Sequence, residues 1–332
     1  MSEIFILSCA PVAQGGGVYK YALDGQGTLE KRAYLPCDKP MYAVNDGKRL
    51  HILLRAPFGK NVAKNENARA EGSAAEEEKY SGYFTCNVDF SNCSEVQSTL
   101  GECACHLAAD GDDVYIANYL SGNIVKNCHL ACVHEGKGVN LPRQDMPHTH
   151  FASFTPDKKY VLCCDLGLDA VFVYDRNLSE VSRANVPEGY GVRHFVFSKD
   201  GHTVYAVNEL VPSVSVFSFR GETLELKNTV HLPCEKQTST AAAIRLSEDE
   251  TKLYVSVRGE NAVFVLQAKG ERSEIVQKSS CGGDSPRDFD VFGDTLICCN
   301  ENSDNVSVFE TENGLLKKQI NSLILKAPLC VL

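Results

Sequence analysis

The fold is decided by the stretch VRHFVFSKDGHTVYAVNELVPSVSVF, residues 192–217, in which three short apolar runs are separated by polar breaks. The first break contains an Asp-Gly pair, which is typical of a tight turn between strands. Runs such as VSVF alternate apolar and polar residues, the pattern of a β-strand with one buried face. This stretch therefore predicts three consecutive strands joined by short connections.

The same arrangement recurs along the chain. Clear copies cover residues 104–125, 147–165, 241–266 and 286–309, and weaker copies cover residues 4–23 and 40–56. Their second strands begin about 45 residues apart, with one longer step of about 64 residues. A repeat of short strands with this period is typical of a β-propeller. We predict an all-β, seven-bladed β-propeller with four antiparallel strands per blade, forming one domain over residues 1–332.

The two ends of the repeat predict how the ring closes. The first copy begins at its second strand, and the final residues APLCVL, 327–332, resemble the first strands of the other copies. A C-terminal strand that completes the first blade would close the ring and protect its edges. The long step contains a polar insertion at about residues 59–84, which we interpret as a solvated loop or a short exposed helix between strands, with a lid over the site as the alternative.

Composition narrows the function classes. The net charge of −10 argues against a nucleic-acid partner, which requires a basic surface. No apolar run is long enough to span a membrane, and the N-terminal apolar run, residues 4–9, is too short for a signal peptide, so we expect a cytoplasmic protein. In such a protein the fifteen cysteines should be reduced. The segment CHLACVH, residues 128–134, lacks the paired ligand spacing of zinc sites, and we predict no metal there.

Alignment of the copies places polar residues at two equivalent positions. The first lies near the start of the innermost strand and contains Tyr42, His106, His150, His194, Ala243 and Asp288, preceded by Met41, Cys105, Thr149, Arg193, Ala242 and Arg287. The second lies at the end of the second strand and contains Cys9, Arg55, Tyr119, Asp165, Glu209, Arg258 and Glu301. Because neighbouring strands run antiparallel, both positions should open on one face of the propeller. Histidines at a channel mouth also serve structural hydrogen bonds, but a cluster of ionisable groups in a cleft favours function.

Several of these stretches resemble the seven-bladed lactonase family, which includes propeller-type 6-phosphogluconolactonases and fungal 3-carboxy-cis,cis-muconate lactonizing enzymes. The resemblance rests on PHTH (147–150), RHFVF (193–197), NEL (208–210) and RG (258–259), in this order, and extends over residues 103–309. It implies a catalytic set of His148 or His150 with Arg193, Glu209 and Arg258, and requires no cofactor. Many members carry an acidic residue in a TAAEIR motif, where this chain has Ala243.

From these two lines of reasoning we expect hydrolysis of a sugar lactone, most simply 6-phosphogluconolactone, in an anion-binding pocket. Catalysis is assigned to His150, Arg193, Glu209 and Arg258, with Glu209 or His150 as general base and the arginines holding the anionic group or the oxyanion. Substrate binding is assigned to His148, His194, Arg287, His106, Tyr119, Asp165 and Glu301. The alternatives are a cycloisomerase of the carboxymuconate type and a propeller that binds a partner without catalysis.

Overall fold

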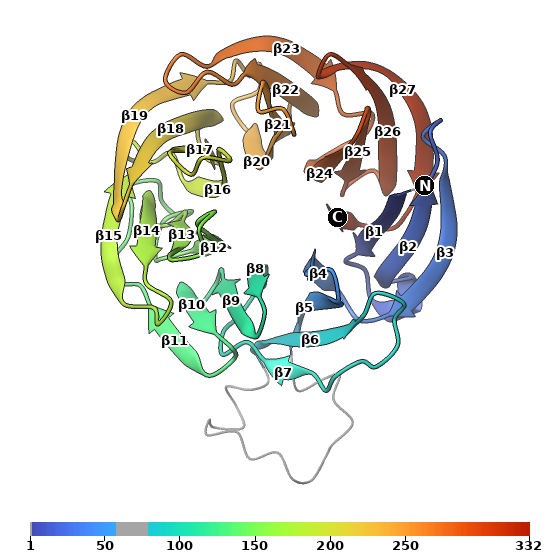
Figure 1. The fold of residues 1–332 in the computed structure, drawn as a ribbon, viewed down its shortest axis with the longest axis horizontal. Helices are drawn as coiled ribbons and strands as arrows, with labels where there is room; N and C mark the ends of the chain where they lie inside the picture. Colours follow the sequence, from blue (N-terminus) through green and yellow to red (C-terminus); the bar gives the residue numbers. More distant parts are fainter. Residues whose placement is uncertain (1, 58–78) are drawn as a thin grey trace.

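Seven four-stranded antiparallel sheets are arranged as blades around a central axis (Figure 1). This computed structural model describes residues 2–57 and 79–332. It confirms the predicted seven-bladed β-propeller, and the only helix in the described residues is a short 3-10 turn, η1 (Val12–Gln14). Within residues 2–57 and 79–332 there is thus no helix long and apolar enough to cross a membrane.

Each blade consists of an innermost strand followed outward by three more. The innermost strands are β4 (Pro40–Asn45), β8 (Ala104–Asp110), β12 (Thr149–Phe154), β16 (Val192–Phe197), β20 (Thr240–Leu246), β24 (Pro286–Phe292) and β28 (Pro328–Val331). The second strands are β1 (Ser2–Ser8), β5 (Arg49–Pro57), β9 (Asp113–Asn118), β13 (Val161–Asp165), β17 (Thr203–Asn208), β21 (Lys252–Arg258) and β25 (Thr295–Asn300).

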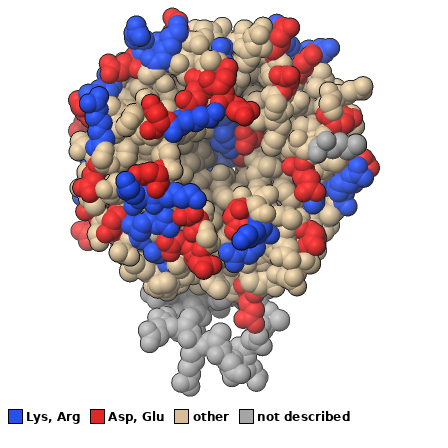
Figure 2. All heavy atoms as spheres, viewed as in Figure 1, with Lys and Arg blue, Asp and Glu red and all other residues tan. Residues whose placement is uncertain are grey.

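The third strands are mostly buried, and only the outermost strands are largely exposed to solvent. The third strands are β2 (Gly17–Leu23), β6 (Ser81–Asn87), β10 (Asn123–Lys126), β14 (Ala170–Tyr174), β18 (Ser213–Arg220), β22 (Ala262–Gln267) and β26 (Asn305–Glu312). The outermost strands are β3 (Leu29–Pro36), β7 (Gln97–Ser98), β11 (Leu130–Val133), β15 (Glu180–Asn185), β19 (Thr223–His231), β23 (Glu274–Ser280) and β27 (Leu315–Ile324). On the face drawn in Figure 2, acidic and basic side chains are interspersed around a central hollow.

The ring closes as predicted, by pairing of the last strand with the first. Strand β28 joins β1 with Ile6 opposite Val331 and Leu7 opposite Cys330, so the first blade combines both ends of the described chain. Most of the insertion expected at residues 59–84 lies outside the described residues, namely 59–78. Its last part differs from the expectation, because residues 81–84 form the start of β6 and pair with β5.

The cores lie between adjacent blades. One cluster joins Phe151, Leu162 and Val171 of one blade to Phe195 and Phe217 of the next, and all five are at most 9% exposed. Each fully buried side chain of this size contributes about 1.5–3 kcal/mol of hydrophobic stabilisation. The cysteines follow the same pattern: all fifteen are free, and several, including Cys163, Cys164 and Cys298, are fully buried.

A β-bulge near the start of the innermost strand is repeated around the ring. In all seven blades one or two residues of this strand have no partner on the second strand, and the first of these unpaired residues is Met41, Cys105, His150, Arg193, Ala242, Arg287 or Leu329. In several blades the residue before the strand also has a left-handed backbone, for example Cys103 with φ 56° and Ser285 with φ 62°. A bulge turns the extra side chain away from the regular alternation of the strand. This repeated bulge decides which side chains reach the channel mouth.

Candidate active site

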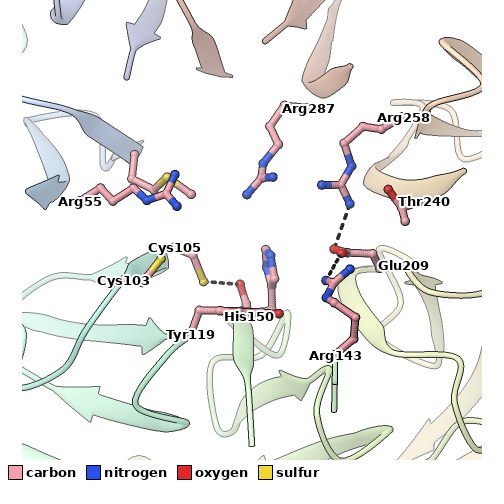
Figure 3. A pocket seen from close by; sticks show the side chains of 11 residues that line it. Arg55, Cys103, Cys105, Tyr119, Arg143, His150, Glu209, Thr240, Arg258 and Arg287 are labelled. Carbon is pink, nitrogen blue, oxygen red and sulfur yellow. Dashed lines mark hydrogen bonds and ion pairs between the residues drawn. The ribbon is translucent and has the colours of Figure 1, made fainter. Parts of the chain in front are cut away.

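A pocket of about 230 Å³ opens at the end of the channel where the innermost strands begin (Figure 3). It is lined by the bulge residues Met41, Cys105, His150 and Arg287, by Arg55, Tyr119, Glu209 and Arg258 from the ends of the second strands, and by Cys103, Arg143 and Thr240. Five strands or loops far apart in the sequence therefore supply its charged side chains. The pocket brings together three of the four predicted catalytic residues, His150, Glu209 and Arg258, and the fourth, Arg193, contacts Glu209.

Glu209 is the centre of an ion-pair network. One of its carboxylate oxygens lies 2.6 Å from Arg143 Nη2, and the other lies 3.0 Å from both Arg193 Nε and Arg258 Nη2. The Glu209 backbone is held as well, because its N–H donates to the Gly191 carbonyl at 2.7 Å. A buried carboxylate with three guanidinium partners is firmly ionised and fixed in place.

The electrostatics of the network follow from these contacts. Burial by itself would raise the pKa of Glu209, but the guanidiniums of Arg258 and Arg193 outweigh it and hold that pKa well below its usual value. Glu209 is therefore a weak base at neutral pH. Its geometry suits the orientation of three arginines better than the removal of a proton from water.

Two further arginines face the pocket without a close carboxylate. Arg287 Nη1 lies 4.0 Å from Glu301, and Arg55 makes no ion pair with any of the described side chains. In Figure 3 both guanidiniums point into the open centre, whereas those of Arg143 and Arg258 are turned toward Glu209. Five arginines and two carboxylates thus meet at this mouth, which leaves a strong local excess of positive charge in an acidic protein. Such an excess favours an anionic ligand.

His150 is the bulge residue of β12 and lies among these cations. It is 4% exposed, and its Nδ1 has no hydrogen-bond partner among the described residues. Burial, reinforced by the Arg193 guanidinium, holds the pKa of His150 well below its usual value, so the imidazole is neutral at pH 7. The lowered pKa makes His150 a weaker base than an ordinary histidine. Its Nδ1, which has no partner among the described residues, is nevertheless free to accept a proton, whereas both oxygens of the Glu209 carboxylate are held by guanidiniums.

His106 and His194 lie below this layer, inside the channel. The centroid of the His106 ring lies 3.8 Å from that of Phe151 and 4.2 Å from that of Tyr42. The His194 ring centroid lies 4.7 Å from that of Phe151. Neither lines the pocket. Arg193 Nη1 donates to His194 Nε2 at 3.0 Å, so His194 supports a site arginine from beneath.

The alignment of the fourth blade was off by one residue in both predicted rings. In β12 the bulge makes His150 the counterpart of Cys105 and Arg193, and Phe151 takes the position of His106 and His194. In β13 the counterpart of Tyr119 and Glu209 is Leu166, because its N–H makes the equivalent backbone bond, here to the His148 carbonyl. The bulge itself is common to these blades, so the offset has another origin. The second strand of this blade begins one residue later than the sequence pattern indicated, at Val161, which is the counterpart of Val114 and Val204.

Asp165 and His148 consequently lie outside the pocket. Asp165 is fully buried and bonds His134 Nδ1 and the His148 N–H. The His148 ring stacks on Tyr119 at 4.4 Å and bonds the Tyr119 carbonyl through Nδ1 at 2.9 Å. These two predicted substrate-binding residues therefore support the lining residue Tyr119 and its neighbours.

Sequence reasoning also missed residues that line the pocket. Arg55 stood in the second predicted ring but was not selected, although its position was the available signal. Arg143 belongs to a connection outside the repeat, so periodicity offered no sign of it. Cys103 and Cys105 flank the start of β8, where thiols were interpreted as packing residues. Among residues 2–57 and 79–332, no three His, Cys, Asp or Glu side chains are arranged to hold a metal ion.

Comparison with known proteins agrees with this fold. A family model described as "Lactonase, 7-bladed beta-propeller" matches residues 5–332. An uncharacterized protein of Staphylococcus aureus is 31% identical over 253 residues, which cover 69% of this chain and 74% of that protein. Two solved structures share the fold: a proposed 6-phosphogluconolactonase of Bacteroides fragilis (TM-score 0.83, 22% identity, 99% and 96% of the chains covered) and the periplasmic gluconolactonase of Pseudomonas aeruginosa (0.82, 23%, 99% and 98%).

Proposed function

The chain belongs to the seven-bladed β-propeller lactonase family, and we propose that it hydrolyses an anionic sugar lactone, 6-phosphogluconolactone, to 6-phosphogluconate. The observation that carries the proposal is the pocket in which a neutral histidine stands among four lining arginines, with a fifth, Arg193, buried against Glu209. The names of two neighbours of the same fold, a proposed 6-phosphogluconolactonase and a gluconolactonase, support the choice of substrate class.

Lactone hydrolysis needs a group that takes a proton from water and donors that hold the carbonyl oxygen as it becomes negative. In the proposed reaction His150 accepts the proton while the water oxygen attacks the carbonyl carbon. The ring C–O bond then breaks, and the proton passes to the leaving ring oxygen, which becomes a hydroxyl. The products are a hydroxyl group, the regenerated neutral imidazole and a carboxylic acid, which releases its remaining proton to solvent and becomes a carboxylate.

The arginines divide this work. In this proposal Arg258, which lines the pocket beside Glu209, holds the oxyanion, and Arg193 is buried against Glu209 and adds its positive charge. Arg55 and Arg287 are free of close carboxylates and suit the phosphate. Guanidinium groups bind phosphate and carboxylate oxygens with paired N–H bonds. Glu209, ionised and triply paired, keeps three of the guanidiniums at fixed positions. In this assignment Glu209 orients the cations and His150 is the base.

The test is turnover of freshly prepared 6-phosphogluconolactone by the purified protein, measured above the spontaneous hydrolysis of the lactone. The wild type should exceed the spontaneous rate, and Arg258→Ala and His150→Asn should reduce kcat/KM by at least about 100-fold. Leu120→Ser, at an exposed position outside the pocket, serves as the control and should retain full activity. A wild-type rate equal to the spontaneous rate would reject the hydrolase.

A cycloisomerase is the second candidate. Arg55 and Arg287 have no close carboxylate, so their guanidiniums are available to bind a substrate with several carboxylates. The same protein should then convert 3-carboxy-cis,cis-muconate to a lactone, with loss of the diene absorbance. Inactivity toward both compounds, together with recovery of a specific protein partner, would favour the non-catalytic propeller.

A further inference from the structure

The connection between β11 and β12, residues 134–148, carries Arg143 to the pocket. It is longer than the corresponding connections of the next blades, residues 186–191 and 281–285. Arg143 makes the shortest ion pair of the Glu209 network, 2.6 Å, although its own side chain is 42% exposed. An exposed guanidinium needs a well-held backbone to keep such a contact, because a long free side chain loses conformational entropy on binding.

One buried carboxylate fastens both ends of this connection. Asp165 Oδ2 accepts from His134 Nδ1 at 2.6 Å, where the connection begins. Asp165 Oδ1 accepts from the His148 N–H at 2.8 Å, where it ends, and from the Leu168 N–H at 3.1 Å. The Asp165 side chain is fully buried, so these bonds form away from water. Charge-assisted bonds of this kind are among the strongest in proteins.

His134 is locked from its other side. Its Nε2 lies 2.6 Å from the Tyr174 hydroxyl, and its ring stacks on Phe172 at 4.0 Å. Both ring nitrogens are therefore engaged with Asp165 and Tyr174. These contacts are the role of His134, the last residue of the CHLACVH segment, and they differ from metal ligation.

The middle of the connection is held by Gln144, the neighbour of Arg143. The buried Gln144 amide donates through Nε2 to the Leu166 carbonyl at 2.8 Å and accepts through Oε1 from the Asn140 N–H at 3.0 Å. Its backbone also bonds Gly138 and Asn140. With both ends and the middle bound, the backbone at Arg143 has little freedom.

The other blades show that this device is specific. At the register position of Asp165, opposite the first residue of the innermost strand, β9, β17 and β25 carry Asn118, Asn208 and Asn300. Two of them also bond the start of the connection that enters their blade: Asn118 Nδ2 donates to the Thr99 carbonyl and Asn300 Nδ2 to the Cys281 carbonyl. The amide oxygens of Asn118 and Asn208, however, have no partner among the described residues, whereas the second oxygen of Asp165 accepts from the far end of its connection. The blade with the long connection has the carboxylate and the histidine that it holds.

We propose that Asp165 and His134 are positioning residues that fix Arg143 against Glu209 and thereby set the affinity of the pocket for the anionic group of its ligand. We call the contacts of Asp165 with His134 and with the His148 N–H the clamp. The identity of the ligand as a phosphorylated sugar acid rests on the proposed function, whereas the clamp does not. Asp165 acts through the connection and never touches the ligand. It should therefore govern binding and KM far more than kcat.

The test compares Asp165→Asn, which introduces the residue of three other blades, with His51→Asn. His51 is a buried histidine of β5 that also bonds a carboxylate and a tyrosine hydroxyl, those of Asp46 and Tyr83, and it lines no part of the pocket. Asp165→Asn should bind 6-phosphogluconate about tenfold more weakly by calorimetry and speed amide hydrogen exchange in residues 134–148, with kcat changed less than about twofold. His51→Asn should leave the dissociation constant and this exchange unchanged. Equal effects of both variants would overturn the proposal.

Coupling to Arg143 provides the decisive result. If Asp165 acts through Arg143, the double variant Asp165→Asn/Arg143→Ala should bind no more weakly than Arg143→Ala alone. If the double variant instead loses affinity by the product of the two single-variant factors, the proposal is overturned. Should Asp165→Asn fail to fold, His134→Asn, which keeps a donor near the Nδ1 position, should bind more tightly than His134→Ala; equal binding would count against the clamp.

The two proposals fail separately. If the wild type neither hydrolyses the lactone nor binds 6-phosphogluconate, the proposed function is rejected. The clamp is then judged by hydrogen exchange in residues 134–148 and by the same double-variant comparison with inorganic phosphate as the probe. Unchanged exchange in Asp165→Asn would reject it.

Discussion

Replacement of Glu209 by Gln should destabilise the protein and disperse the arginine cluster. The Glu209 side chain is 5% exposed and has guanidinium nitrogens at 2.6 Å and, twice, at 3.0 Å. Breaking a buried ion pair by removal of one partner costs about 3–5 kcal/mol. The amide oxygen of Gln still accepts one hydrogen bond, which offsets about 1 kcal/mol. We therefore expect the free energy of unfolding to fall by about 2–4 kcal/mol.

The assay is urea unfolding, with the midpoint shift converted through a common m-value. Glu301→Gln is the matched control, because Glu301 is 30% exposed and lies 4.0 Å from its nearest guanidinium, Arg287. An exposed pair at that distance contributes less than about 1 kcal/mol. A Glu209→Gln variant no less stable than Glu301→Gln would refute the reasoning that Glu209 holds the cluster together.

The pH dependence provides a second check on the same residue. The pKa of Glu209 in the folded protein lies well below its ordinary value of 4.5. A depressed carboxyl pKa contributes stability that is complete above the unfolded pKa and is lost as the pH falls toward the folded one. The stability gap between wild type and Glu209→Gln should thus be constant from about pH 8 to pH 5 and narrow below about pH 4.5. A gap that closes near pH 6 would contradict the assignment.

Three further outcomes are expected. Arg55→Ala and Arg287→Ala should each weaken 6-phosphogluconate binding about tenfold by calorimetry while changing stability by less than about 1 kcal/mol, because neither has a close carboxylate; unchanged affinity would remove them from the anion site. His150→Asn should lower kcat by at least about 100-fold and leave product binding within about threefold, a split that a purely structural role would not produce. Burial raises the pKa of the Cys86 thiol to about 12 and of the Cys281 thiol to about 11. The stability that these thiols contribute is therefore complete below their ordinary pKa and is lost as the pH rises toward the raised values, at about 1.4 kcal/mol per pH unit for each thiol. Urea unfolding from pH 8 to 11 under reducing conditions checks this, and Cys281→Ala should reduce the fall of the unfolding free energy with pH.

The fold was predictable because short local sequence patterns specify its strands and turns, and these patterns repeat along the chain. Seven copies of a strand pattern indicated the blades, and the likeness of residues 327–332 to the other first strands indicated the closure by β28. Strand alternation and turn residues act over a few positions, so they are visible in the chain itself. The repeat also located the mouth of the channel, since Glu209, Arg258 and Tyr119 hold equivalent places.

The site was predictable only in part, because the repeat gives equivalent positions but not the direction of each side chain. The bulge at the start of the innermost strands turns Cys105, His150 and Arg287 into the pocket. In the fourth blade a one-residue shift of the second strand had also placed His150 and Asp165 one position away from their true counterparts. The sequence by itself determined the number of blades, the closure of the ring and the residues near the mouth. Only the tertiary structure decided which of them face the pocket, that Arg143 from a non-repeating connection completes the Glu209 network, and that Asp165 fastens this connection. These contacts join residues 17 to 66 positions apart, and nothing in the local pattern specifies such pairings.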